Sequence, residues 1–129
     1  MKILIVSDSH GRMNNLIRVI EKVKPIDLML HLGDIEGNEN TIREITPCNV
    51  EMISGNNDYY TSLEKEKVIK LGNHTVFLSH GHRYGVNFRT DYIKEAAEER
   101  YRIEYGLLIQ AVFRSPDKRA EFQPSLLWI

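Results

Sequence analysis

Four short apolar runs, each followed by a cluster of polar residues, constrain the fold of this 129-residue chain more than any other feature. The runs cover residues 3–6, 28–32, 50–53 and 75–78. The clusters that follow them are Asp8-Ser9-His10, Gly33-Asp34, Gly55-Asn56-Asn57-Asp58 and His80-Gly81-His82. Runs of this length are typical of buried strands, and an open α/β sheet keeps its active site beyond the carboxyl ends of its strands. The pattern therefore predicts an α/β fold with one candidate metal centre.

The first half of the chain alternates between strand and helix spacing. Strands are predicted at residues 2–6, 28–32 and 50–53, and helices at residues 14–24 and 40–45. Pro25 and Pro47 close the two helices, because the residue before a proline is pushed out of the helical region. Strand, helix, strand, helix, strand with short connections predicts right-handed crossovers and a parallel sheet.

The second half begins with a different pattern. Residues 67–71 and 75–79 are rich in strand formers and are separated by Gly72-Asn73-His74, which predicts a hairpin. Residues 91–102 are predicted to be a helix, with Thr90 as its candidate cap. A further strand is predicted at residues 105–109, and residues 110–129 carry no motif that we can place.

Composition limits the function classes. The chain is 42% hydrophobic and 27% charged, which is ordinary for a globular protein and predicts a single domain over residues 1–129. Its formal net charge of −1 gives no nucleic-acid or anionic-membrane signature. Cys48 is the single cysteine, so no internal disulfide can form. We find no signal-peptide pattern and no apolar run long enough to cross a bilayer, so we expect a cytoplasmic protein.

Taken alone, three of the clusters have ordinary structural explanations. In an extended segment, Asp8 and His10 would point to the same side and could reach one cation, but a turn aspartate and a surface histidine are the commoner case. Asp34 could be a turn residue or a carboxylate that bridges two cations. Asn56 could bond its own loop backbone or offer a neutral carbonyl oxygen to a metal.

His80-Gly81-His82 carries more information, because two histidines around a glycine directly after an apolar strand are hard to explain structurally. Two other histidines have ordinary structural explanations. His31 lies inside a predicted strand and is expected to pack beneath the site, and His74 lies in the predicted turn and is expected to be solvated. The combination decides the interpretation, since four weak motifs in this order after strands are not expected by chance.

The ordered series Asp8-Ser9-His10-Gly11, His31-Leu32-Gly33-Asp34, Gly55-Asn56-Asn57-Asp58 and His80-Gly81-His82 resembles the calcineurin-like metallophosphoesterases. Within them it is most similar to the small bacterial and archaeal YfcE-like phosphodiesterase branch. The resemblance covers about residues 1–105. It implies an α-β-β-α sandwich of two facing mixed sheets with a two-metal site at one edge.

The resemblance also implies ligands. Asp8 and His10 correspond to ligands of the first metal, and Asp34 to the bridging ligand. Asn56 and His80 correspond to ligands of the second metal. A mixed oxygen and nitrogen ligand set favours Mn, with Ni, Fe and Zn as alternatives, over Ca or Mg.

The proton donor is left open. The superfamily often has a histidine general acid where this chain has Asn57, and the small phosphodiesterase branch commonly lacks that histidine too. Asp58 and His82 are therefore the candidate donors.

Asn57 and Arg12 are the candidates for substrate contact, although a solvated arginine at a helix start is the commoner explanation for Arg12. Two cations of this kind would clamp a phosphoryl oxygen and lower the pKa of a bridging water. The resemblance to the phosphodiesterase branch implies that the substrate is a small phosphodiester.

One expected motif is missing. The family pattern has Gly-His-x-His after the last helix, but no histidine follows His82, and residues 105–113 read Tyr-Gly-Leu-Leu-Ile-Gln-Ala-Val-Phe. Residues 106–129 could be an altered or truncated tail, for example from a frameshift, or a variant with weakened metal binding. A third alternative is a non-catalytic scaffold, because some relatives of this fold serve assembly after losing metal ligands. Exposed sheet edges and apolar tail residues would also favour a homo-oligomer.

Overall fold

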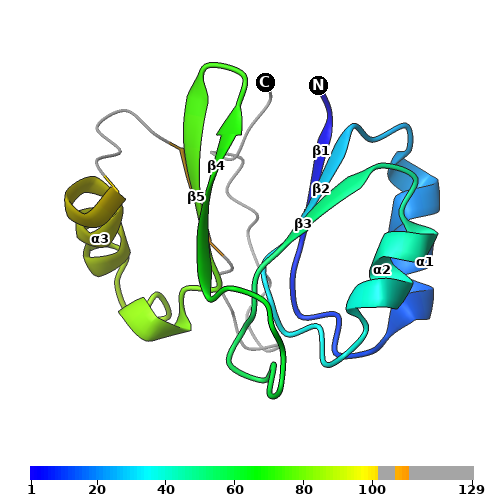
Figure 1. Ribbon diagram of the computed structural model, residues 1–129, viewed down its shortest axis with the longest axis horizontal. Coiled ribbons are helices and arrows are strands. Elements are labelled where there is room, and N and C mark those ends of the chain that lie inside the picture. The colour runs from blue at the N-terminus through cyan, green and yellow to red at the C-terminus, as the bar shows by residue number, and fades with distance from the viewer. Residues whose placement is uncertain (102–106, 111–129) are drawn as a thin grey trace.

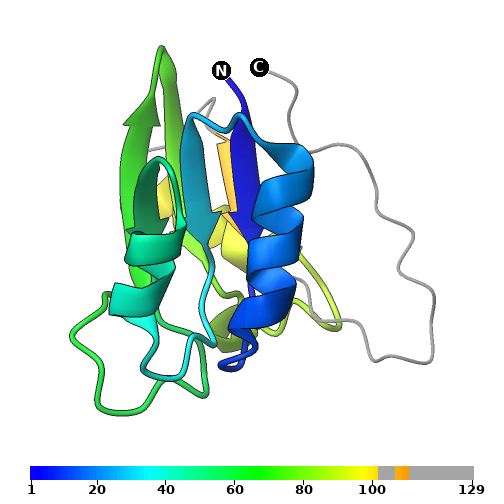
Figure 2. The same cartoon turned by 90° about the vertical axis from the view of Figure 1, so that its right-hand side faces the viewer.

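Two sheets face each other in the structure, a computed structural model that describes residues 1–101 and 107–110. The first sheet holds β1 (Ile3–Val6), β2 (Leu28–His31) and β3 (Asn49–Met52), parallel and in that order. α1 (Met13–Val23) and α2 (Glu39–Ile45) cover its outer face (Figures 1 and 2). The predicted strand–helix alternation with parallel pairing is therefore confirmed.

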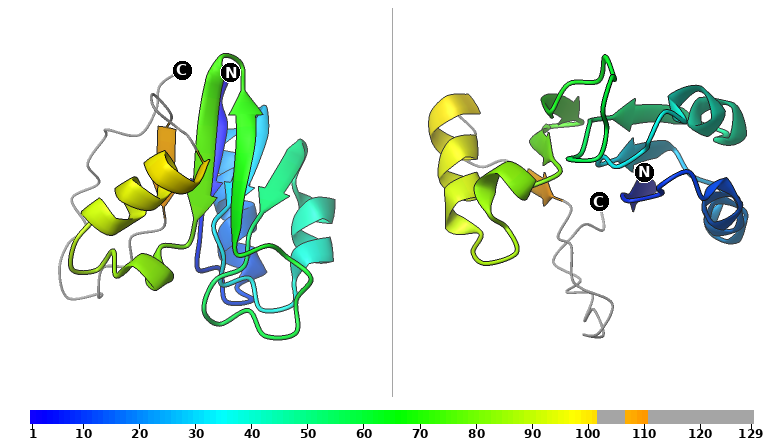
Figure 3. Two further views of the ribbon diagram at one scale, coloured as in Figure 1. Left: turned by 60° about the vertical axis from the view of Figure 1, so that its left-hand side comes forward. Right: turned by 90° about the horizontal axis from the view of Figure 1, so that it is seen from below.

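The second sheet holds β4 (Glu66–Leu71), β5 (His74–Ser79) and β6 (Leu107–Gln110) in that order. β4 and β5 pair antiparallel, whereas β5 and β6 pair parallel, so this sheet is mixed. After β5 come a short 3₁₀ turn, η1 (His82–Tyr84), and α3 (Asp91–Tyr101). α3 covers the outer face of this sheet (Figure 3). The order of layers is helices, sheet, sheet, helix, which confirms the α-β-β-α sandwich.

Strand alternation builds the layers of the core. Side chains on a strand point to opposite faces in turn. On β2, Leu30 packs between the sheets and its neighbour Met29 packs under α1 and α2. On β5, Val76 and Leu78 pack between the sheets, while Phe77 packs against α3. All five side chains are fully buried, so both sheets are held from both faces in their central strands.

Two details differ from the sequence prediction. β1 was expected to be buried, but it is half-buried, because among the described residues it pairs with β2 alone and lies at the edge of the sheet. His74 was placed in the hairpin turn, but it opens β5 opposite Leu71. The turn is made by Gly72 and Asn73, and Gly72 takes the left-handed φ of +58°. His74 is exposed, as expected.

The last two predicted elements are described only in part. The structure describes α3 over Asp91–Tyr101 and β6 over Leu107–Gln110, while residue 102 of the predicted helix and residues 105 and 106 of the predicted strand lie outside the described residues. The predicted divergent tail falls almost entirely outside the described residues. In the part of the chain that the structure describes, no helix is both long and apolar enough to cross a membrane.

The fold brings the predicted clusters to one edge. β1, β2, β3 and β5 all run in the same direction in Figure 1 and end at its lower side. The loops that follow these strands therefore gather there, although they are far apart in the sequence. Seen from that side, the segment that follows β3 crosses from the first sheet to the second (Figure 3). The sandwich thus places the polar clusters together, as the topology predicts.

Candidate metal centre

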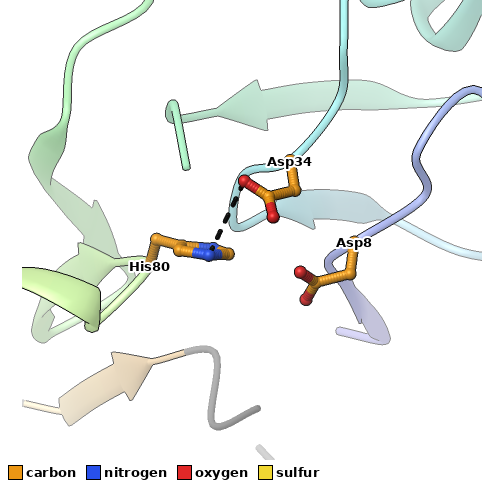
Figure 4. A group of neighbouring side chains, drawn as sticks. All are labelled: Asp8, Asp34 and His80. Carbon is orange, nitrogen blue, oxygen red and sulfur yellow. Dashed lines mark ion pairs between the residues drawn. The ribbon is translucent and has the colours of Figure 1, made fainter. Parts of the chain in front are cut away.

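Three loops supply one compact group of ligand atoms. Asp8, Asp34 and His80 each offer an atom within 4.8 Å of the other two (Figure 4). They follow β1, β2 and β5 respectively. His10 lies next to this group, because its Nε2 is 3.7 Å from Asp8 Oδ1 and 3.7 Å from Asp34 Oδ2. Four of the five predicted ligands thus lie together in the fold.

Asp34 lies between the two sides of this group. Its Oδ2 faces His10, and its Oδ1 lies 3.7 Å from His80 Nε2. Asn57 fixes the carboxylate, since its backbone N–H donates to Oδ1 at 2.9 Å and its Nδ2 donates to Oδ2 at 2.7 Å. Each carboxylate oxygen has about two acceptor sites. Each oxygen therefore has one acceptor site left, and the two remaining sites face different histidines. A ligand that bridges two cations needs this arrangement.

His80 and Asn56 form the second side. The buried His80 donates its Nδ1 proton to the carbonyl oxygen of Leu32 at 2.7 Å. Its Nε2 then carries a lone pair, which faces Asn56 Oδ1 at 3.0 Å and Asp34 Oδ1 at 3.7 Å. Three electron-rich atoms from three loops thus converge on one point. A cation placed among them would satisfy all three.

Asp8 gives a direct test of whether a cation fits. Its Oδ1 is buried and has no hydrogen-bond partner in the described structure, whereas its Oδ2 accepts from the Ser7 hydroxyl. A buried carboxylate oxygen without a partner is costly unless a cation or water satisfies it. Because this oxygen lies beside His10 Nε2, the residues present fit a divalent cation. The mixed nitrogen and oxygen donors suit a first-row transition metal.

The two carboxylates have different electrostatic surroundings. Burial raises the pKa of Asp8, and the hydrogen bond from Ser7 offsets this only in part. Burial also acts to raise the pKa of Asp34, but the two hydrogen bonds from Asn57 and the nearby His80 outweigh it, so this pKa is lowered. Asp34 is therefore held as a carboxylate at neutral pH, ready to bind a cation.

The backbone of the ligand loops is unusual. Asp8, His10, Asp34 and Glu36 all adopt left-handed φ angles, of 56°, 44°, 57° and 57°. The expectation that Asp8 and His10 point together from an extended segment is therefore wrong: they converge from a left-handed turn after β1. Such angles are uncommon outside glycine, and they cluster at functional sites.

Two glycines allow the loops after β2 and β3 to touch. A Cβ built on Gly33 would lie 2.5 Å from the backbone nitrogen of Gly55. A Cβ built on Gly55 would lie 2.2 Å from Asp34 Oδ1. Neither distance is possible for real atoms, so both positions require glycine. The glycines of the two clusters are explained by this close approach.

Asp58 holds the same two loops together. Its carboxylate accepts four backbone N–H bonds, each of 2.7 Å, from Asp34, Ile35, Glu36 and Gly55. Both of its oxygens are therefore directed at backbone amides. Asp58 therefore has a structural role, which its position in the sequence did not indicate.

A pocket of about 250 Å³ opens over the ligand atoms. Its lining residues are His10, Asp34, Asn56, Asn57, His80, His82, Val86 and Asn87. The predicted residues Asn57 and His82 thus lie at the pocket. Asp58 and Arg12 do not line it; Arg12 is exposed at the start of α1. Val86 and Asn87 had no signal in the sequence, because they come from the loop after η1, which carries no motif.

His82 lies beside His80, with 5.4 Å between the ring centroids. Its pKa is lowered, first by burial and then by electrostatic interaction with the neighbouring His80 and Arg83. At neutral pH His82 is therefore a neutral imidazole with one N–H. Such a group can donate one hydrogen bond into the pocket.

His31 supports the ligand loops from below. It is fully buried, and the Gly33 N–H donates to its Nδ1 at 3.3 Å. The proton is therefore on Nε2, which lies 3.0 Å from Ser9 Oγ and donates to it. Burial lowers the pKa of His31 to about 4. The expectation that His31 packs beneath the site is confirmed.

Comparison with known proteins identifies the superfamily of this chain. A family model for the calcineurin-like phosphoesterase superfamily domain matches residues 1–107. The probable metallophosphoesterase YsnB of Bacillus subtilis (strain 168) is 32% identical over 87 residues, which are 67% of this chain and 50% of that protein. This chain thus spans about half the length of the curated relative that it matches.

Solved structures agree. A protein from Streptococcus pneumoniae TIGR4, described as a predicted phosphoesterase, is 25% identical with a TM-score of 0.60, covering 77% of this chain and 56% of that one. Wild-type Vps29 of Entamoeba histolytica, solved in complex with Zn²⁺, is 20% identical with a TM-score of 0.61, covering 85% and 63%, and shows the fold alone. From the family match and the geometry together, the chain belongs to the calcineurin-like phosphoesterase superfamily.

Proposed function

We propose that this protein is a metal-dependent phosphoesterase that hydrolyses a small phosphodiester. The observation that carries the proposal is Asp34, whose two carboxylate oxygens face two different histidines, His10 and His80, at 3.7 Å each. This geometry supports a shared ligand between two cations. When bound, such cations activate a water and stabilise the charge on the transferring phosphoryl group.

The chain's own residues would then divide the work. Asp8 and His10 would hold one cation, Asn56 and His80 the other, and Asp34 both. Leu32 keeps the His80 proton on Nδ1, so that Nε2 stays free to bind. The site loops are preorganised by backbone contacts, so they need little rearrangement when a cation arrives.

His82 and Asn57 are our candidates for contact with the substrate. Both line the pocket, and neutral His82 can donate its ring N–H to a phosphate oxygen or to the leaving group. Asp58 is the weaker candidate for the proton donor, because four backbone amides occupy its oxygens. Arg12 would reach only a long substrate, since it does not line the pocket.

The charge of the pocket supports a diester over a monoester. None of its described lining residues is lysine or arginine. A phosphodiester carries a single negative charge, whereas a phosphomonoester at neutral pH carries nearly two. Without a lysine or arginine in the described lining, the protein itself offers no cationic side chain to the second charge of a monoester, which favours the singly charged diester. We further propose Mn as the metal, with Ni, Fe or Zn as alternatives, and a cytoplasmic location.

Hydrolysis of a chromogenic aryl phosphodiester and its monoester, with added Mn²⁺, tests the proposal. We expect faster turnover of the diester by the wild type and a loss of at least about 100-fold in Asp34→Asn, because the shared ligand loses its charge. Asp27→Asn, an exposed aspartate at the other end of β2, is the matched control and should keep full activity. Equal rates for wild type and Asp34→Asn would contradict the proposal.

A non-catalytic binding protein is the second candidate, and one observation favours it: no histidine follows His82, so the family's Gly-His-x-His motif is absent from this sequence. Two imidazole ligands would then be lacking. A folded wild type that binds Mn²⁺ but hydrolyses neither ester would support this alternative over the enzyme.

A further inference from the structure

Glu36 adopts a backbone conformation that a glutamate rarely adopts. Its φ is +57°, in the left-handed region, where a residue with a long side chain is strained. Two contacts hold it there: its N–H donates to Asp58 Oδ1 at 2.7 Å, and its carbonyl oxygen accepts from Asn38 Nδ2 at 3.1 Å. Glycine would adopt this conformation without strain. The side chain of Glu36 therefore calls for an explanation.

That side chain points at a candidate metal ligand. Glu36 Oε1 lies 2.6 Å from Nδ1 of His10. The opposite nitrogen of the same ring, Nε2, faces Asp8 and Asp34 at 3.7 Å each. A carboxylate on Nδ1 requires a proton there, and in a neutral imidazole this leaves the lone pair on Nε2. The direction of the ring and the place of its proton are thus set from the side away from the cation.

We propose that Glu36 is a positioning residue for His10, holding its imidazole in the Nδ1–H form with Nε2 directed at the metal site. Metal-binding histidines elsewhere commonly donate their second ring N–H to a carboxylate, and loss of that partner weakens metal binding. The inference rests on the proposed function only in taking His10 as a ligand. Its first consequence, the position of the proton on the His10 ring, can be measured in the metal-free protein.

The competing explanation is an ordinary surface ion pair. The side chains of Glu36 and His10 are 41% and 32% exposed, and exposed pairs usually contribute little. Such a pair would not explain why the backbone of Glu36 is held in a strained conformation by Asp58 and Asn38. It also predicts that loss of the Glu36 carboxylate leaves Mn²⁺ affinity unchanged.

Three variants separate these explanations. Glu36→Gly removes the carboxylate and suits the left-handed backbone. Glu36→Gln keeps an oxygen that can accept from Nδ1–H. Glu21→Gly would disturb α1, so Glu21→Gln is the matched control: this glutamate forms an exposed 2.6 Å ion pair with Lys24, away from the site. Nitrogen NMR of the His10 ring, at about pH 9 where imidazole is neutral, reports the proton's position.

We expect wild type, Glu36→Gln and Glu21→Gln to keep the Nδ1–H form, and Glu36→Gly to move toward the Nε2–H form. The Mn²⁺ dissociation constant should rise about 10–100-fold in Glu36→Gly, and less in Glu36→Gln. The urea midpoint of Glu36→Gly should stay level or rise, because the strain is relieved. That combination, weaker metal binding in an equally stable protein, is not the result of a merely structural role.

An unchanged ring form in metal-free Glu36→Gly would overturn the inference, whatever the metal data show. Should the wild type bind no Mn²⁺ at all, the proposed function fails, but the NMR comparison still decides the role of Glu36. The two failures are therefore distinguishable.

Discussion

The Asp34 carboxylate lies so close to the backbone of Gly55 that a methyl group at residue 55 would occupy its place. A Cβ there would be 2.2 Å from Oδ1 and 2.6 Å from the Asp34 backbone nitrogen. Gly55 has no left-handed φ, so contact alone demands glycine at this position. At the scale of the residue, the metal site depends as much on absent side chains as on the ligands themselves.

Gly55→Ala should therefore displace Asp34. We expect a loss of about 1–3 kcal/mol in the free energy of unfolding from overpacking, and at least a tenfold loss in Mn²⁺ affinity. Urea unfolding and calorimetric titration measure the two effects. Gly72→Ala is the control, because nothing lies within 4 Å of its Cβ but its φ of +58° is strained. It should cost stability while leaving Mn²⁺ affinity unchanged; a similar affinity loss in both variants would contradict the argument.

His31 gives a prediction about pH. Burial lowers the pKa of His31 to about 4, below the usual 6.5, so the unfolded chain binds a proton that the folded chain does not. Stability contributed by neutral His31 is thus present above the unfolded pKa and is lost as pH falls toward the folded pKa. Between pH 7 and pH 4.5 this loss amounts to about 2–3 kcal/mol.

Urea unfolding of wild type and His31→Gln at these two pH values, with a chelator present, tests the direction of this pH dependence. The wild type should lose more stability on acidification than the variant, because glutamine cannot be protonated. Glutamine also has a donor and an acceptor, as His31 has for Ser9 and Gly33. Parallel pH dependence in the two proteins would show that His31 is not the group responsible.

At the scale of the element, the loops after β2 and β3 behave as one unit. Asp58 joins them by three backbone hydrogen bonds of 2.7 Å and accepts a fourth from Gly55 in its own loop. Asn57 joins the loops by two more bonds, both to Asp34. The strands themselves are only four residues long, so they cannot define the loop geometry alone. The position of Asp34 therefore follows from the loop after β3 as well as from its own strand.

Asp58→Asn tests this unit. Asparagine has one acceptor oxygen in place of two and no charge, so part of the backbone bonding is lost. We expect destabilisation by about 2–3 kcal/mol, together with weaker Mn²⁺ binding. Asp91→Asn, at an exposed ion pair with Arg89, should cost less than about 1 kcal/mol. Unchanged stability with abolished hydrolysis would instead favour Asp58 as the proton donor.

The positions of the strands could be predicted from the sequence better than the conformations of the loops. Short apolar runs located each strand of the first sheet within one residue, because an uninterrupted apolar run reflects burial on both faces of a strand. The loops depend on contacts between distant segments, so the left-handed turn at Asp8 and the clamp by Asp58 could not be predicted. The role of Glu36 could not be predicted for the same reason, because it depends on a contact with the ring of His10, 26 residues earlier in the chain.

At the scale of the whole molecule, the sandwich brings four loops from two sheets to one edge. The buried layer between the sheets holds that arrangement, because Leu30 and Leu32 of one sheet's strand and loop pack with Val76 and Leu78 of the other. The family motifs allowed this architecture to be predicted, since their order in the sequence implies the topology. The sequence pattern in residues 106–129 did not match the family, and that part lies mostly outside the described residues.

Mn²⁺ binding at equilibrium tests the central claim, a two-cation site shared through Asp34, most directly. Dialysis of the folded chain against Mn²⁺ should give two ions per chain for the wild type. Asp34→Asn should bind fewer than two and more weakly, with its fold checked by circular dichroism. A folded wild type that binds no Mn²⁺, or an Asp34→Asn variant that binds as much as the wild type, would contradict the account.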